Sequence, residues 1–299
     1  MQPLIPWFEV PGITIPGLGL ELHGFGFLVA LGFVFGGKAA MSRARRLGLD
    51  PEVINRLIGW LVLGTFVGGH VGYGLMYEPA EYLADPRQFL YVWQGLSSFG
   101  GFVVCVPLSI WFFYKERVPV WKYLDCLAYG MSVGWFFGRM GCFVAHDHPG
   151  TPTEFLTGVW CTPEPGHMID LPDQIVLHEP HRNLPWGPCA EQDGVIAVHD
   201  MGLYEALWSL SMFGVYQVMD RLKGWKPGVL VLSFGVSYVP VRFAMDLLRP
   251  ETSDPRYGFG PAMLTPAQWL SLVLLAACVY GISQRLRAKD AAVQPETGF

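Results

Sequence analysis

The chain has 299 residues, of which 52% are hydrophobic and only 15% charged, and its net charge is −5. Ordinary soluble domains carry about 25% charged residues, so the composition indicates an integral membrane protein. It excludes a disordered or fibrous chain, and the sparse positive charge, which forms no single patch, excludes a basic nucleic-acid-binding protein. We therefore expect membrane lipid, and no nucleic acid, around this chain.

Apolar stretches divide the chain into predicted spans, because a helix needs about 20 mostly apolar residues to cross a bilayer. Seven stretches meet or nearly meet this requirement: 22–42, 57–77, 96–114, 123–145, 201–219, 227–248 and 266–284. We expect an all-α polytopic membrane protein with about seven transmembrane helices. One membrane domain would cover residues 1–285, and residues 286–299 would form a cytoplasmic tail.

The placement of Lys and Arg predicts the orientation. Fourteen of the 20 lie near the connections between spans one and two, three and four, and five and six, or after span seven. The positive-inside rule therefore puts the N-terminus outside and the C-terminus in the cytoplasm. The first 20 residues lack a basic start and contain four prolines, so we expect an ordered external segment and not a cleavable signal.

The longest polar stretch, residues 146–200, falls on the outer side and is rich in Pro, His and acidic residues. We expect it to form a small extracytoplasmic head between helices four and five. Cys161 and Cys189 lie in it and could pair in an oxidising compartment, although no spacing signature supports a disulfide.

Glycines recur every four residues in the second and fourth predicted spans: Gly64, Gly68, Gly72, Gly130, Gly134 and Gly138. Such spacing lets helix backbones approach closely in lipid, so tight packing is the plainest interpretation. A compact bundle built in this way favours a rigid pocket over a wide pore.

Charged residues form a layer inside the predicted spans. Arg139 and Arg242 each lie six residues from the outer end of a span, about 9 Å below the boundary. His70 falls at a similar depth, and Asp246 follows Arg242 by four residues on the same helix face. A self-contained Arg242–Asp246 pair would explain two of these residues. Two arginines at one depth also suit a phosphate, which predicts an anionic phospholipid held from the outer leaflet.

Six short segments stand in order along the chain: 23–26, 68–73, 93–101, 138–150, 199–205 and 238–249. Together they resemble the signature segments of the prolipoprotein diacylglyceryl transferase family. The resemblance implies an enzyme of the bacterial cytoplasmic (inner) membrane. It implies transfer of the diacylglyceryl group of phosphatidylglycerol to the lipobox cysteine thiol in a pre-lipoprotein signal peptide. A thioether forms and glycerol-1-phosphate is released, without a cofactor or a metal.

The resemblance also implies residue roles. Arg139 would hold the lipid phosphate, and Arg242 would stabilise charge as the ester bond breaks. The other expected catalytic residues are Asp246, Tyr238, His70 and His146. The other expected substrate-binding residues are Gly68, Gly69, Phe25, Ser98, Gly100, Asp147, Gly150, Tyr204 and Glu205.

Several positions depart from the family pattern. Gly100 stands where members carry a His or a Tyr, and Cys142 stands where an Asn usually follows Arg-x-Gly. Phe25 replaces a Tyr, Asp246 a Glu and His70 an Arg. The anion-binding half of the site is thus retained, while the proton-handling half is altered. A histidine suits a replacement base, and we expect His70 or His146; the alternative is that each is a hydrogen-bonded structural residue.

Other functions remain open at this point. A diverged family member could bind anionic phospholipid yet use another acceptor or be inactive. A secondary transporter would need internal repeats that the halves do not show. A metal-dependent hydrolase could use the segment His146-Asp147-His148, in which alternate residues could bind one metal. However, the sequence has no His-Glu-x-x-His motif and no third ligand at a recognisable spacing. An intramembrane serine protease is weaker still, because Ser97 and Ser98 lack a Gly-x-Ser-Gly frame.

Overall fold

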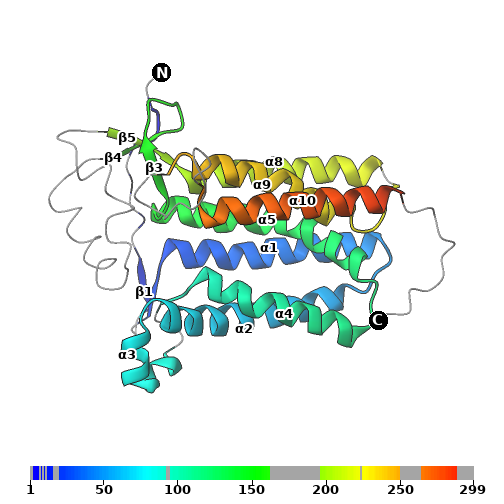
Figure 1. Ribbon diagram of the computed structural model, residues 1–299, viewed down its shortest axis with the longest axis horizontal. Helices are drawn as coiled ribbons and strands as arrows, with labels where there is room; N and C mark the ends of the chain where they lie inside the picture. Colours follow the sequence, from blue (N-terminus) through cyan, green and yellow to red (C-terminus); the bar gives the residue numbers. More distant parts are fainter. Residues whose placement is uncertain are drawn as a thin grey trace.

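The described part of the chain has seven long helices, which run side by side in the computed structural model (Figure 1). The structure describes residues 3–6, 8, 10, 12–15, 20–91, 95–161, 196–222, 224–249 and 264–287. The long helices overlap the seven predicted spans, and this confirms the all-α fold class. They are α1 (Gly24–Arg46), α2 (Pro51–Met76), α4 (Ser98–Glu116), α5 (Val120–Ala145), α8 (Met201–Leu222), α9 (Val229–Asp246) and α10 (Pro266–Arg287).

Among the described residues, four helical segments are long and apolar enough to cross a bilayer: α1, α2, α9 and Gln268–Arg287 of α10. Large apolar side chains point away from the bundle, as Leu270, Val273 and Tyr280 do on α10. Such a surface suits lipid and not water. The chain is therefore a polytopic membrane protein, while the count of seven spans stays a prediction.

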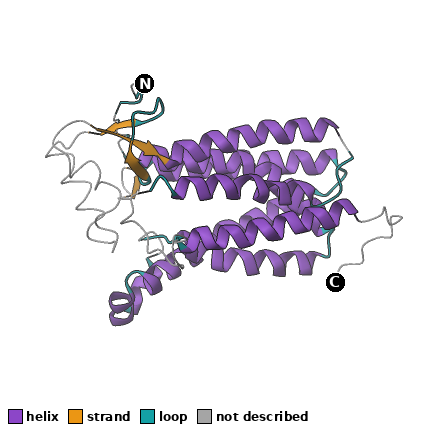
Figure 2. Ribbon diagram, turned by 45° about the horizontal axis from the view of Figure 1, so that its top comes forward, coloured by secondary structure: helices purple, strands orange, loops and turns teal. Residues whose placement is uncertain are grey.

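A small sheet lies at the end of the bundle where α5 ends and α8 begins (Figures 1 and 2). Its antiparallel strands have the order β3 (Pro149–Pro152), β5 (Ile196–Asp200) and β4 (Val159–Cys161). The short helix α3 (Pro79–Ala84) and the 3₁₀ helix η1 (Pro86–Leu90) lie at the same end. We call this end the sheet end.

The strands β3, β4 and β5 belong to the stretch predicted as a head. Residues 162–195, including Cys189, lie outside the described residues, as do the side chain of Cys161 and the tail from 288 onward. The head, the Cys161–Cys189 pair and the cytoplasmic tail therefore stay predictions.

The N-terminal segment packs on the sheet. Ile5 forms a bridge with Val159, and the backbone N–H and indole N–H of Trp160 donate to Ile5 and Pro3 carbonyls, each at 2.9 Å. Strands β1 (Ile13–Ile15) and β2 (Leu20–Leu22) pair as an antiparallel hairpin just before α1. The described part of this segment is thus ordered, and its sheet contacts are an addition to the predicted all-helical fold.

Glycine contacts hold α1 to α5 and α2 to α4. A Cβ added to Gly130 would lie 2.4 Å from the carbonyl oxygen of Gly36, and one added to Gly68 would lie 2.7 Å from that of Gly100. The predicted close packing is confirmed at these positions. It is wrong at Gly138, where an added Cβ would meet no atom within 4 Å.

Asp125 shows how one acidic residue inside a predicted span is satisfied. Its carboxylate accepts hydrogen bonds from the backbone N–H groups of Gly228 at 2.8 Å and Val231 at 3.0 Å. These are free donors at the N-terminus of α9, which also carries partial positive charge. Asp125 therefore joins α5 to α9 at the end of the bundle opposite the sheet.

Candidate active site at the sheet end

Three helices meet at the carboxylate of Glu205, which lies on α8 and is 2% exposed. Its Oε2 lies 2.9 Å from Nε of Arg139 on α5 and accepts a 2.9 Å hydrogen bond from the hydroxyl of Tyr238 on α9. The indole of Trp135 donates to the same oxygen at 3.3 Å, and the Arg139 guanidinium lies 4.8 Å from that ring centroid. Glu205 thus fixes the direction of Arg139, whose side chain stays 20% exposed.

A second ion pair joins Arg242 to Asp246, as the i,i+4 spacing predicted. Nη1 of Arg242 lies 2.8 Å from Oδ1 of Asp246, and Asp246 Oδ2 accepts a 2.7 Å hydrogen bond from the Thr265 hydroxyl. Thr265 and Gln268 cap α10 reciprocally, since each side chain accepts from the other's backbone N–H. Within the described residues, neither Arg242 Nη1 nor Asp246 Oδ1 makes a hydrogen bond of good geometry, although both are buried.

Tyr238 donates to Glu205 and precedes Arg242 by one turn of α9, so this helix carries residues of both pairs. The site thus contains two guanidinium groups, each with one buried carboxylate partner. A bound anion could draw either guanidinium away from its carboxylate or share it. The binding of a single phosphate by both arginines stays a prediction.

The two expected bases are enclosed by backbone. His70 is fully buried, and its ring nitrogens face the carbonyl oxygens of Gln88 at 2.9 Å and Gly95 at 3.3 Å. His146 is 5% exposed, lies 2.9 Å from the Phe8 carbonyl oxygen and faces Asp200 at 3.8 Å. These contacts favour structural roles, and catalysis by either histidine stays a prediction.

The glycines near α4 also have packing roles. A Cβ on Gly100 would lie 2.3 Å from the Gly68 carbonyl oxygen, so this position has no room for a larger side chain. Gly69 packs on Leu96, and its carbonyl accepts from the Ser97 N–H at 2.9 Å. The side chain of Ser98 lies outside the described residues. Substrate contact at Gly68, Gly69, Ser98 and Gly100 stays a prediction that these packing contacts do not support.

The remaining expected residues lie around β3 and β5. Gly150 allows β3 to pass over α8 and α9, since an added Cβ would lie 2.7 Å from the Leu248 carbonyl oxygen. The Tyr204 hydroxyl pairs with Nδ1 of His199 at 2.7 Å and with the Thr157 hydroxyl at 3.2 Å. Burial lowers the pKa of His199, which therefore stays neutral at neutral pH. Phe25, on the first turn of α1, is 41% exposed and packs on Gly141.

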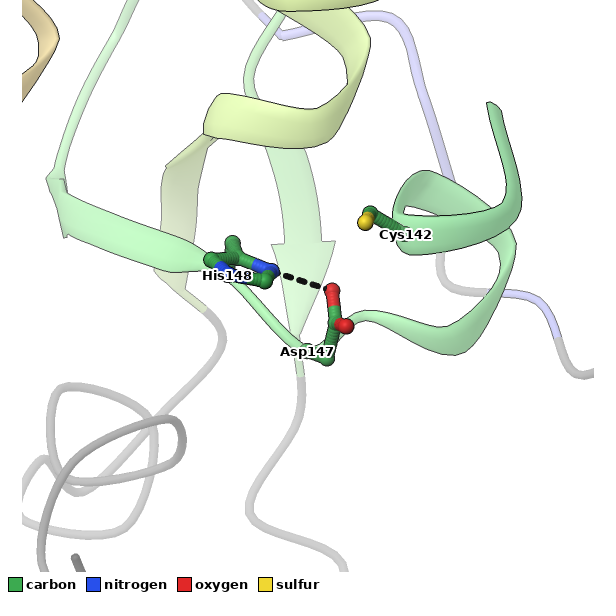
Figure 3. A group of neighbouring side chains, drawn as sticks. All are labelled: Cys142, Asp147 and His148. Carbon is green, nitrogen blue, oxygen red and sulfur yellow. Dashed lines mark hydrogen bonds and ion pairs between the residues drawn. The ribbon is translucent and has the colours of Figure 1, made fainter. Parts of the chain in front are cut away.

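Asp147 belongs to a group of possible metal ligands that the sequence did not predict (Figure 3). The group contributes three possible ligand atoms, one each from Cys142, Asp147 and His148, and these atoms all lie within 4.8 Å of one another. Nδ1 of His148 lies 2.5 Å from Oδ1 of Asp147. The alternative trio of His146, Asp147 and His148 does not come together, because His146 turns toward Phe8 and Asp200. Cys142 takes the third position.

Several residues of the site were missed from sequence. Trp135 precedes Arg139 by four residues, so helical spacing could have placed the two together. Thr265 and Gln268 have the spacing of a capping box, which marks the start of α10. The partnership of Glu205 with Arg139 has no local signal, because it joins residues 66 positions apart on two helices.

Comparisons with known proteins identify the family of the chain. Residues 13–283 match the family model described as prolipoprotein diacylglyceryl transferase. The chain is similar to the phosphatidylglycerol–prolipoprotein diacylglyceryl transferases of Chromohalobacter salexigens (29% identical, covering 98% of this chain and all of the relative) and Solidesulfovibrio magneticus (28%, 96% and 98%). The similarity to that of Cereibacter sphaeroides is 29% identity over 81% of this chain and 80% of the relative. Because the match extends along almost the whole chain, the protein belongs to the prolipoprotein diacylglyceryl transferase family.

Proposed function

We propose that this chain transfers the diacylglyceryl group of phosphatidylglycerol to the lipobox cysteine thiol of a pre-lipoprotein. The products are a thioether-linked lipid and glycerol-1-phosphate. The observation that carries this proposal is the pair of arginines, Arg139 and Arg242, at one end of a helical bundle whose sequence matches the family over residues 13–283.

The chemistry requires a charged leaving group to be stabilised. Phosphatidylglycerol carries one negative charge, and the departing glycerol phosphate carries a second as the carbon–oxygen bond breaks. Guanidinium groups suit this work because they donate in a planar fork and stay charged. Glu205 and Asp246 would hold Arg139 and Arg242 in place before the lipid enters, and Tyr238 would link the two pairs.

For the topology, we place the sheet end on the outer face of the bacterial inner membrane, with the N-terminus outside and the C-terminus in the cytoplasm. Basic residues support this orientation, since Arg43, Arg45 and Arg46 end α1 away from the sheet. Residues 1–285 would form one membrane domain with the head inserted at 146–200. The site would then open where secreted pre-lipoproteins arrive.

The test is transfer from phosphatidylglycerol vesicles to a lipobox peptide by the purified chain. Arg139→Lys keeps the charge but loses the fork, and we expect transfer to fall on the order of 100-fold. Arg43→Lys is the matched control, because Arg43 is also buried and paired, with Asp220 at 2.8 Å, at the opposite end. Equal loss in both variants would contradict a role for Arg139 in the reaction.

A second candidate function is supported by Gly100, which leaves no room for the family's His or Tyr. In that case the chain would bind anionic phospholipid but transfer it to another acceptor or not at all. Binding of phosphatidylglycerol that depends on Arg139, with no product on a lipobox peptide, would favour this candidate. Product on the peptide would exclude it.

A further inference from the structure

We propose that Cys142, Asp147 and His148 hold a divalent metal ion with the ligand preference of zinc. We further propose that its open coordination position takes the sulfur of the acceptor cysteine. The inference about the sulfur rests on the proposed function, whereas the metal site itself does not. It reverses the expectation from sequence that no metal takes part.

The end of α5 brings the three side chains together. His146 closes the helix in the left-handed conformation, with φ 51°, and turns the chain back over the last turn. The backbone N–H of Asp147 then donates to the Cys142 carbonyl at 3.4 Å, so Asp147 lies above Cys142. The carbonyl of His148 accepts from Met201 N–H at 3.2 Å, and this fixes His148 against the start of α8. Figure 3 shows the three side chains converging.

The donor atoms favour zinc. Thiolate sulfur, imidazole nitrogen and carboxylate oxygen are the three ligand types that Zn²⁺ takes in proteins. Three protein ligands with an open fourth position are typical of reactive zinc sites, while structural sites are closed by four. Cys142 is 8% exposed, whereas the side chains of Asp147 and His148 are 40% and 32% exposed. Asp147 and His148 therefore lie on the more exposed side of the group, from which an acceptor sulfur could reach the ion.

The charges around the group are balanced by such an ion. Two positive charges of the metal would neutralise one thiolate and one carboxylate. Nη1 of Arg139 lies 3.8 Å from Sγ of Cys142, so a cation lies beside this sulfur. A second thiolate, from the acceptor, would then sit between the metal and a cation.

A metal would supply the thiol activation that a side-chain base would otherwise provide. Gly100 cannot carry a base, and the backbone contacts of His70 and His146 enclose the other two candidates. On binding zinc, the acceptor thiol would release its proton to water and keep the electron pair on sulfur. That sulfur would form the bond to the glyceryl carbon, and the carbon–oxygen bond would break. The glycerol phosphate would leave with the bonding electrons, facing Arg139 and Arg242.

Direct metal binding is the first test, and it needs no activity. Purified chain stripped with a chelator is titrated with Co²⁺, and we expect one equivalent to give a thiolate-to-cobalt charge-transfer band that Zn²⁺ abolishes. Cys142→Ser should remove the band. Cys126→Ser is the matched control, because Cys126 lies on the same helix with its sulfur 3.7 Å from Arg43 Nη1. His148→Gln should weaken Co²⁺ binding, while His23→Gln, at an exposed position, should not.

Transfer is the second test. A free thiol with a pKa of about 8.5 is only a few per cent thiolate at pH 7, so losing the metal should slow transfer about 30-fold there. The deficit should shrink as the pH rises toward 9, because the thiol then ionises unaided. Zinc should restore the pH 7 rate to the chain itself and to Cys126→Ser, but not to Cys142→Ser.

The outcomes separate the two proposals. A missing cobalt band, or a band that survives Cys142→Ser, overturns the metal site even if transfer is normal. A Cys142-dependent band with a pH 7 transfer rate indifferent to the chelator overturns the role of the metal in thiol activation. A Cys142-dependent band with no transfer under any condition supports the metal site and contradicts the proposed transferase function.

Discussion

The two ends of α5 carry nearly the same trio of groups in different surroundings. Away from the sheet, Arg43 lies 2.8 Å from Asp220 and contacts Cys126 at 3.7 Å. At the sheet end, Arg139 lies 2.9 Å from Glu205 and contacts Cys142 at 3.8 Å. A buried arginine with a carboxylate and a thiol is therefore not by itself a sign of function in this molecule.

The neighbours distinguish the two ends. Cys126 is fully buried within a cluster of apolar side chains from α1, α2, α4 and α5. Cys142 instead lies beside Asp147 and His148, whose possible ligand atoms lie within 4.8 Å of its own. The converging polar side chains around Cys142 distinguish this end of α5 from the apolar cluster around Cys126.

The largest contrast is expected from neutralising the two carboxylates. Glu205→Gln would leave Arg139 buried beside a neutral amide, so we expect the free energy of unfolding to fall by about 3–5 kcal/mol and transfer by about 100-fold. Asp220→Asn should lower the free energy of unfolding by a comparable amount, because it leaves Arg43, whose side chain is only 8% exposed, without its charged partner, but it should leave transfer unchanged. Unfolding in detergent and the lipobox-peptide assay measure both quantities. An equal loss of transfer in both variants would contradict the comparison.

A smaller contrast is expected from two glycines on α5. Gly130→Ala forces a Cβ against the Gly36 carbonyl and should lower the free energy of unfolding by about 1–3 kcal/mol. Gly138→Ala, near the sheet end, meets no neighbour within 4 Å and should leave it unchanged or raise it by up to about 1 kcal/mol. Thermal unfolding of the two variants tests this order. A larger loss of stability for Gly138→Ala would contradict it and would show that another group packs against Gly138.

The smallest effect expected is a pH dependence confined to the sheet end. Burial lowers the pKa of His199 in the folded chain, so below the ordinary histidine pKa of about 6.5 the unfolded chain binds the proton more readily. Stability should therefore rise as the pH increases through this range and fall as the pH decreases. Amide hydrogen exchange around β5 should show this slope, and His199→Gln should flatten it. An identical slope near Arg43 would contradict a local effect.

Much of the fold could be predicted because it depends on local features of the chain. Apolar runs marked the seven long helices to within a few residues at most ends, and the i,i+4 spacing predicted the Arg242–Asp246 pair. The strands were not predicted, since β3 and β4 are only four and three residues long and pair with β5 from beyond residue 195. Short strands depend on partners that periodicity does not reveal.

The site divides in the same way. The identity and depth of Arg139 and Arg242 could be read from sequence, because a charge inside an apolar stretch stands out. Their partners depended on how helices rotate and pack. Glu205 reaches Arg139 only because α5 and α8 lie together, and Cys142 meets His148 only because the chain reverses at His146.

The sequence by itself therefore determined the membrane class, the helices and the cations of this protein, since hydropathy and helical spacing act over a few turns. The tertiary structure decided which side chains meet. Close glycine packing between α2 and α4 left no room for a larger side chain at Gly100. The left-handed turn after α5 brought three possible metal ligands together. Contacts of this kind depend on the relative rotation of packed helices and on single backbone angles, which hydrophobic pattern does not encode.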